Sequence, residues 1–301
     1  MKITLPDNSS RELPEGSSGY DLAKDIGPGL AKSAVAVTID GVQRDLHDVI
    51  GVDSAVSIIT IDSDEGIEIM RHTLTAQVLA RAIKNLYPKS KLAIGPTVQD
   101  GFYYDVESDE SISSDDLSKI EEEMKKIIKT KSAITKKLVS KKEALKIFKS
   151  NKEPYKEIII NESDQDDNFQ LYYQDDEEFV DLCRGPHLPN LGFIGSFKLT
   201  KVSGAYWKGD SKNSMLTRIY GTAFSNDKDL QNHLDNIEEA LKRDHRKLGK
   251  EMDLFHFQDE APGMVFWHPN GWTVYRKLRN FVRDRLKENN YIEVNTPQVI
   301  D

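Results

Sequence analysis

The stretch Ala34-Val35-Ala36-Val37-Thr38-Ile39-Asp40-Gly41 decides the fold of the N-terminal region. Its β-branched, apolar run is typical of a buried strand, and Asp40-Gly41 is a dipeptide that two-residue hairpin turns favour. The sequence on either side predicts further strands at residues 2–5, 11–13 and 55–61, and a helix at residues 19–26. So many strands around one helix in a short span predict a β-grasp, ubiquitin-like module at residues 1–62.

Composition bounds the class of protein. The 301 residues are enough for two or three domains, and 30% charged with 38% hydrophobic residues is ordinary for a soluble protein. The single cysteine excludes an intrachain disulfide, and the sequence has no signal core and no membrane-spanning run. We therefore expect a cytoplasmic protein with no membrane partner. The formal charge of −9 argues against indiscriminate nucleic-acid binding but allows a local basic surface.

Residues 63–225 are predicted to form a second domain of α/β type. Apolar residues from Leu74 to Leu86 recur at helical spacing, and Pro88 ends that helix. The stretch Lys125–Lys152 holds eleven lysines and one acidic residue. It is either a solvated helix surface or a face that contacts phosphate groups, and the sequence leaves both interpretations open.

The last quarter of the chain predicts a connector and an incomplete domain. One long helix is expected at residues 229–250, with basic residues toward its end. Residues 251–301 hold an amphipathic helix from Trp272 to Leu286 and a strand at Tyr291–Val294, followed by Pro297. One helix and one strand cannot close a core, so we expect this region to begin a larger domain of a longer protein. The predicted fold class is multidomain α+β.

The stretch Cys183-Arg184-Gly185-Pro186-His187 is the first candidate for a functional site. A thiol and an imidazole four residues apart, across a rigid Gly-Pro turn, can share a water, a metal ion or a proton. Taken alone the spacing is a weak signal, because a lone cysteine is often only a small buried apolar residue. Asp181 lies two residues upstream and adds a carboxylate to the same stretch.

Several long stretches, in the same order, resemble bacterial threonyl-tRNA synthetases. Those stretches are Ala93–Pro96, Asp100–Asp105, Asp181–His187, Gly204–Asp210, Arg218–Ala223, Lys242–Gly249 and Glu260–His268. The resemblance extends over all 301 residues. It implies four parts: a TGS domain at 1–62, an editing domain at 63–225, a linker helix at 226–250, and at 251–301 the start of a class II catalytic domain with its motif 1.

The resemblance also implies an activity and partners. Enzymes of this family attach threonine to tRNA(Thr) with ATP and are homodimers, and their editing domain hydrolyses tRNA(Thr) wrongly charged with serine. Their zinc ion and Mg-ATP would bind beyond Asp301, so no cofactor is expected within these residues. A non-catalytic tRNA-binding module and a free-standing editing factor are the alternatives, and the motif 1 segment argues against the second.

Editing has a physical rationale. Serine lacks one methyl group of threonine, and a synthetic site rejects such an analogue by only about 1–3 kcal/mol. A second site that hydrolyses the ester needs a positioned water and a proton acceptor. The predicted catalytic residues are Cys183, His187, His72, Lys156 and Asp181. The predicted substrate-binding residues are Thr73, Gln77, Tyr104, Tyr206 and Asp100.

Several of these assignments carry alternatives. Lys156 matches an editing-site lysine of the family that would contact phosphate or the leaving oxygen, and otherwise it is a surface lysine. Asp181 would bind the substrate amine or orient a histidine, or it is a surface carboxylate. Tyr104 and Tyr206 would stack on the terminal adenine of tRNA, or each packs in the core.

One departure from the family pattern affects this site. The family carries His-x3-His in the first editing helix, and counting back from Ala82 without gaps places Thr73 and Gln77 at the two histidine positions. His72 lies one residue early, which in an α-helix is a rotation of about 100° from Thr73. We therefore expect impaired but nonzero editing, and no metal ion bound by His72, Cys183 and His187.

Overall fold

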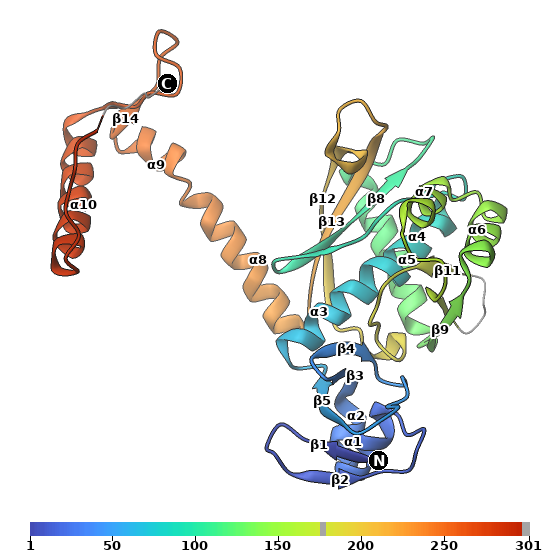
Figure 1. Cartoon of the computed structure of the whole chain (residues 1–301). Coiled ribbons are helices and arrows are strands. Elements are labelled where there is room, and N and C mark those ends of the chain that lie inside the picture. The colour runs from blue at the N-terminus through green and yellow to red at the C-terminus, as the bar shows by residue number, and fades with distance from the viewer. Residues whose placement is uncertain (175–178, 297–301) are drawn as a thin grey trace. The chain divides into compact units, whose positions relative to one another are not determined.

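The computed structural model describes residues 1–174 and 179–296. The chain divides into two compact units, Met1–Gln231 and Asn232–Asp301, and each is described by itself (Figure 1). Helices alternate with strands throughout the first unit, so the predicted mixed α+β class is confirmed. No helix among the described residues is long and apolar enough to cross a membrane.

The N-terminal module, blue in Figure 1, is one five-stranded sheet with two helices. Its elements are β1 (Lys2–Thr4), β2 (Ser10–Glu12), α1 (Gly19–Ile26), α2 (Pro28–Ser33), β3 (Ala34–Ile39), β4 (Val42–Asp45) and β5 (Ser54–Thr60). The strand order is β2-β1-β5-β3-β4, with β1 and β5 parallel and the other neighbours antiparallel. Asp40 (φ 47°) and Gly41 (φ 82°) both take the left-handed conformation that the β3–β4 hairpin requires.

Two further sheets form the middle region. The first, in the order β12-β13-β8-β6 with β7 on β8, contains β6 (Lys91–Leu92), β7 (Thr97–Val98), β8 (Gly101–Glu107), β12 (Ser196–Tyr206) and β13 (Met215–Phe224). The second, in the order β11-β10-β9, contains β9 (Ile134–Val139), β10 (Phe169–Gln174) and β11 (Val180–Leu182). The accompanying helices include α5 (Leu117–Lys129), α6 (Lys141–Ser150) and α7 (Pro154–Glu162), with short 3₁₀ turns η2 (Ser114–Asp116), η3 (Leu191–Phe193) and η4 (Trp207–Gly209).

The helix predicted from Leu74 is longer than expected and is not uniform. It begins as α3 (Asp64–Thr73), widens into the π-helix η1 (Leu74–Leu79) and continues as α4 (Ala80–Leu86). Every side chain of η1 is buried, and η1 contacts β8 of one sheet and β11 of the other. The helix therefore joins the two sheets of the middle region.

The core extends from the middle region into the N-terminal module. Val35, Ala36 and Ile59 of the N-terminal sheet belong to the same buried cluster as Ile69 and Met70 of α3. The burial of apolar surface drives such packing, so the module and the middle region stabilise each other.

The second unit corrects two predictions. The helix expected at 229–250 is two helices, α8 (Asp227–Lys242), which crosses the division between the units, and α9 (His245–Glu251). Asp244 separates them and caps α9, because its carboxylate accepts the backbone N–H of Arg246 at 2.8 Å. Tyr291–Val294 is not a strand, since no strand pairs with it among the described residues, and Pro297 lies outside them.

The predicted amphipathic helix of the second unit is confirmed, and a hairpin that the sequence did not predict precedes it. A short hairpin of β14 (Phe255–His256) and β15 (Phe266–Trp267) precedes α10 (Pro269–Glu288), which is the predicted amphipathic helix. Its apolar side chains are exposed within this unit: Leu278 is 60% exposed and Phe281 57%.

Candidate functional site

Three predicted catalytic residues meet in one cluster. His72 lies near the end of α3, and Cys183 and His187 lie in the turn that follows β11. His72 Nε2 is 2.8 Å from Cys183 Sγ. The rings of His72 and His187 stack, with centroids 4.6 Å apart and planes inclined by 8°. Two residues far apart in the sequence thus flank the single thiol.

The π-helix explains how His72 reaches this cluster. The expectation that His72 lies one residue early, rotated by about 100° from Thr73, assumed an α-helix between His72 and Ala82. The segment η1 lies between them, and a π-turn takes about one residue more than an α-turn. The extra residue changes the rotation of everything that precedes it. The ungapped α-helical count is therefore wrong for the direction of His72.

Thr73 fixes the proton on His187. The Thr73 hydroxyl donates to the carbonyl oxygen of Ile69 at 2.8 Å and accepts the backbone N–H of Leu188 at 3.0 Å. Its only proton is therefore used, so toward His187 Nδ1, 3.1 Å away, it acts as an acceptor. Nδ1 of His187 then carries the ring proton and Nε2 carries a lone pair. Thr73 is fully buried and acts on His187, which differs from its predicted contact with substrate.

Burial sets the protonation states of the cluster. It raises the pKa of the Cys183 thiol to about 12. Burial first, and the Lys156 charge second, lower the pKa of His72 to about 4. Burial, and then His72, lower the pKa of His187 well below its ordinary value. At neutral pH the cluster is thus a protonated thiol beside two neutral imidazoles, and Nε2 of His187 has no hydrogen-bond partner among the described groups.

Lys156 and Asp181 form a buried ion pair. Lys156 Nζ, near the start of α7, is 2.6 Å from Asp181 Oδ1 in β11, and the two side chains are 4% and 2% exposed. The alternatives of a surface lysine and a surface carboxylate are therefore wrong. Burial raises the pKa of the Asp181 carboxyl, and the Lys156 ammonium opposes that shift. A buried charge without a partner is strongly unfavourable, so each of these two side chains needs the other to remain charged in the interior.

The four other predicted substrate-binding residues differ in how exposed they are. Tyr104 is fully buried, with its hydroxyl 3.5 Å from Asp181 Oδ2, so it packs in the core and offers no face to a base. Tyr206, at the end of β12, is 41% exposed. Asp100 is exposed and lies 3.9 Å from Arg71. Gln77 is fully buried, and its side-chain amide has no partner among the described groups.

A cavity of about 270 Å³ borders the cluster. His72, Gly185 and Pro186 line it, together with Gln43 of the N-terminal module. Gly185 has φ +63°, and a Cβ there would lie 2.0 Å from the hydroxyl of Tyr172. Only glycine therefore allows the turn to pack this closely at the edge of the cavity.

Two domain families match the chain. Residues 1–60 match the TGS domain, and residues 170–220 match the family described as threonyl and alanyl tRNA synthetase second additional domain. The chain is 49% identical over 299 residues to the threonine–tRNA ligase of Prochlorococcus marinus (strain MIT 9211) and, over as many residues, 49% identical to that of Hahella chejuensis (strain KCTC 2396). The chain is a homologue of the threonine–tRNA ligases. Both alignments cover 99% of it and 46% of the relative, so it spans about half the length of these curated relatives.

The matches support two regions of this threonine–tRNA ligase homologue but not their limits. The TGS match lies inside residues 1–62, and the other match lies inside residues 63–225. The boundaries at residues 62, 225 and 250 stay predictions. The π-helix and His72 lie outside both matched ranges, so their place in the site is seen only in the structure.

The cluster has the donors of a zinc site but not its geometry. The candidate ligand atoms of His72, Cys183 and His187 all lie within 4.8 Å of one another, and His and Cys are the ligands that zinc prefers. A bound ion must lie near the plane of each imidazole that coordinates it. The nearly parallel, stacked rings place their lone pairs in separate planes, so one ring would have to turn. That no metal binds here stays a prediction.

Sequence reasoning missed the contribution of the N-terminal module. Asp45 of β4 accepts the backbone N–H of His187 at 2.8 Å, across 142 residues of sequence, and also contacts Tyr172. Neither Asp45 nor Tyr172 belongs to a stretch that carried the resemblance. The only available signal was the polarity of Gln43, Arg44 and Asp45 in a short strand, which is equally typical of an exposed edge.

Proposed function

We propose that the chain is part of a threonine–tRNA ligase and that its middle region hydrolyses tRNA(Thr) charged with serine. The observation that carries the proposal is the unpaired Nε2 lone pair of His187, buried in one cluster with Cys183 and with His72, which lines a neighbouring cavity. Identity of 49% to two threonine–tRNA ligases supports the assignment. The whole enzyme would act in the cytoplasm as a homodimer, with threonine, ATP, zinc and tRNA(Thr) as its ligands.

The proposed mechanism uses water as the nucleophile. A thiol whose pKa burial raises to about 12 is protonated at neutral pH, so Cys183 does not attack the ester itself. Nε2 of His187 takes a proton from water, and the oxygen of that water attacks the ester carbonyl. The ribose oxygen leaves with a proton returned from the imidazolium. The products are serine and tRNA(Thr) with a free terminal hydroxyl.

The other residues bind and orient the substrate in this proposal. The Lys156–Asp181 pair places one positive and one negative group together, and these suit the phosphate and the α-amine of the aminoacyl end. Tyr206, which is exposed, remains available for stacking on a base. Gln77 and Asp100 stay proposed substrate contacts. Exclusion of threonine rests on one methyl group, so the rate ratio between the two esters should be about 10–200.

Deacylation of purified seryl-tRNA(Thr) by the 301-residue chain tests this proposal. We expect hydrolysis above the spontaneous rate, slower hydrolysis of threonyl-tRNA(Thr), and loss of activity in His187→Ala. Cys183→Ala should keep part of the activity, because the thiol is not the nucleophile. Binding of tRNA without hydrolysis would show that the middle region is a docking module instead.

A further inference from the structure

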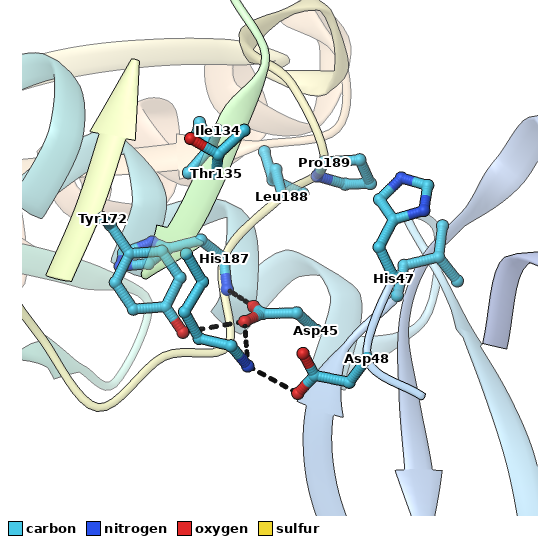
Figure 2. Close-up of a pocket in the computed structure, with 11 residues that line it drawn as sticks. Asp45, His47, Asp48, Ile134, Thr135, Tyr172, His187, Leu188 and Pro189 are labelled. Carbon is cyan, nitrogen blue, oxygen red and sulfur yellow. Dashed lines mark hydrogen bonds and ion pairs between the residues drawn. The ribbon is translucent and has the colours of Figure 1, made fainter. Parts of the chain in front are cut away.

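Asp45 of the N-terminal module holds the turn that carries His187. Figure 2 shows its carboxylate pointing at this turn from the end of β4. One carboxylate oxygen, Oδ1, accepts the backbone N–H of His187 at 2.8 Å, and Oδ2 accepts the hydroxyl of Tyr172 at 2.8 Å. The two oxygens of one side chain thus bind both the backbone of the proposed base and a side chain that packs on it.

Tyr172, which Asp45 binds, packs against two residues of the turn, Gly185 and His187. Its ring meets the ring of His187 edge to face, with centroids 4.4 Å apart and planes inclined by 74°. A Cβ added to Gly185 would lie only 2.0 Å from the Tyr172 hydroxyl, so this hydroxyl packs directly against the glycine. Because Asp45 orients that hydroxyl, it fixes the ring that supports His187 as well as the backbone that precedes it.

Lys136 of β9 pairs with both Asp45 and Asp48 and so holds the Asp45 side chain in place. Lys136 Nζ lies 2.8 Å from Asp45 Oδ2 and 2.5 Å from Asp48 Oδ2. The side chains of Asp45 and Lys136 are only 15% and 17% exposed, so water screens their attraction weakly. Asp48 shares the lysine, but among the described residues no hydrogen bond or ion pair links its side chain to the His187 turn. Asp48 is therefore a natural control for Asp45, because it pairs with the same lysine but does not bind the turn.

We propose that Asp45 is a positioning residue for His187, and that the N-terminal module thereby forms part of the hydrolytic site in the middle region. The inference rests on the proposed editing function. Thr73 fixes the ring of His187 from the helix, and Asp45 fixes its backbone from the opposite module. Both anchors are needed to hold Nε2 at one point of the cluster with His72 and Cys183, and the shared core of the two regions keeps them in register.

Three variants of the 301-residue chain test the role of Asp45. Asp45→Ala removes both hydrogen bonds and the ion pair. Asp45→Asn keeps one oxygen for the His187 N–H but removes the charge that faces Lys136. Asp48→Ala removes a charge from the same lysine without touching the turn, so it is the matched control. Circular dichroism establishes that each variant is folded.

Two kinds of measurement separate positioning from general stability. The first is deacylation of seryl-tRNA(Thr), with kcat and KM determined separately. The second needs no activity: the alkylation rate of Cys183 by iodoacetamide, which is unambiguous because the chain has one cysteine, and hydrogen exchange of the backbone of residues 183–190. A loosened turn exposes the thiol and the His187 amide together.

We expect Asp45→Ala to lower kcat about tenfold with KM within twofold of wild type, and to speed alkylation and exchange about tenfold. Asp48→Ala should stay within twofold of wild type, and Asp45→Asn should recover most of the loss. Equal effects of Asp45→Ala and Asp48→Ala, or an Asn variant as impaired as the Ala variant, would overturn the proposal. If wild type does not hydrolyse seryl-tRNA(Thr), the proposed function fails, and alkylation and exchange alone decide on Asp45.

Discussion

At the scale of single residues, Thr73 has a role that its place in the sequence concealed. An imidazole has two tautomers, and the partner of one nitrogen decides which form is present. The Thr73 hydroxyl donates its only proton to the carbonyl oxygen of Ile69, so it can offer only a lone pair to His187 Nδ1. A position that seemed to have lost a histidine thus supports one supplied from elsewhere.

Replacing Thr73 by valine should therefore damage the site and the fold together. The change leaves His187 Nδ1 and the Leu188 N–H buried without a partner, and we expect a loss of about 1–3 kcal/mol in the free energy of unfolding, measured with urea. Seryl-tRNA(Thr) hydrolysis should fall at least tenfold. Thr75→Val is the control, because the Thr75 hydroxyl donates to the Tyr103 carbonyl at 2.9 Å, away from the turn. An equal loss of activity in both variants would contradict a specific role for Thr73.

The buried histidines predict how stability depends on pH. The folded-state pKa of His72 is about 4 and that of His187 is well below its ordinary value, in each case because of burial first. The unfolded chain therefore binds protons that the folded chain does not. Their contribution to stability is present above about pH 6.5 and is lost as the pH falls toward 4.

We expect the free energy of unfolding to decrease between pH 7 and pH 5, approaching roughly 1.4 kcal/mol per pH unit for each histidine at the lower end. Urea denaturation at several pH values measures this slope. His72→Gln should make it clearly shallower, since one of the two buried imidazoles is gone. A slope that is the same in wild type and variant would show that His72 takes up its proton without unfolding.

The sequence predicted the chemistry of the site better than its anchors. Cys183 and His187 stood out because two reactive side chains shared one short stretch, and Lys156 and Asp181 through the family resemblance. Asp45 has no such neighbour: its partners lie 91, 127 and 142 residues away, at Lys136, Tyr172 and His187. Contacts of this kind depend on how two domains dock, and no local pattern records that.

At the scale of elements, the π-helix decides which residue faces the thiol. The segment Leu74–Leu79 is buried throughout and lies between His72 and the regular helix α4. Periodicity of 3.6 residues predicted a helix here correctly, but it cannot show where one turn takes an extra residue. The β3–β4 hairpin was easier, because Asp40-Gly41 specifies its turn locally.

Deleting Ala76 should turn the π-segment back into an α-helix. We expect helix content by circular dichroism to be kept, while His72 rotates by about 100° away from Cys183. Thr73 should turn away from His187 in the same way, so hydrolysis should fall at least to the level of His72→Ala, and adding His72→Ala to the deletion should change nothing further. A deletion variant that stays more active than His72→Ala would show that the extra residue is not what aims His72.

At the scale of the whole molecule, the basic residues fall into two groups. Those near the end of the predicted linker pair with acidic residues two to four positions earlier in the chain: Lys242 with Glu238, Arg243 with Glu239, and Arg246 with Asp244. In the lysine-rich stretch, Lys136 likewise forms ion pairs, with Asp45 and Asp48. Lys142, Lys146 and Lys149 instead share one exposed face of α6, three and four residues apart.

The exposed face of α6 is therefore the better candidate for contact with tRNA phosphates. We expect the triple change of Lys142, Lys146 and Lys149 to Gln to weaken tRNA(Thr) binding, measured by fluorescence anisotropy at 50–200 mM salt. The slope of log affinity against log salt should become shallower by roughly 0.7–0.9 for each phosphate contact removed, since fewer counterions are released. Changing Lys242, Arg243, Arg246 and Lys247 to Gln removes at least as much positive charge from residues already paired, and it should alter the slope less. If this second variant has the larger effect, the tRNA contacts lie along the linker helices and the lysines of α6 are only solvated.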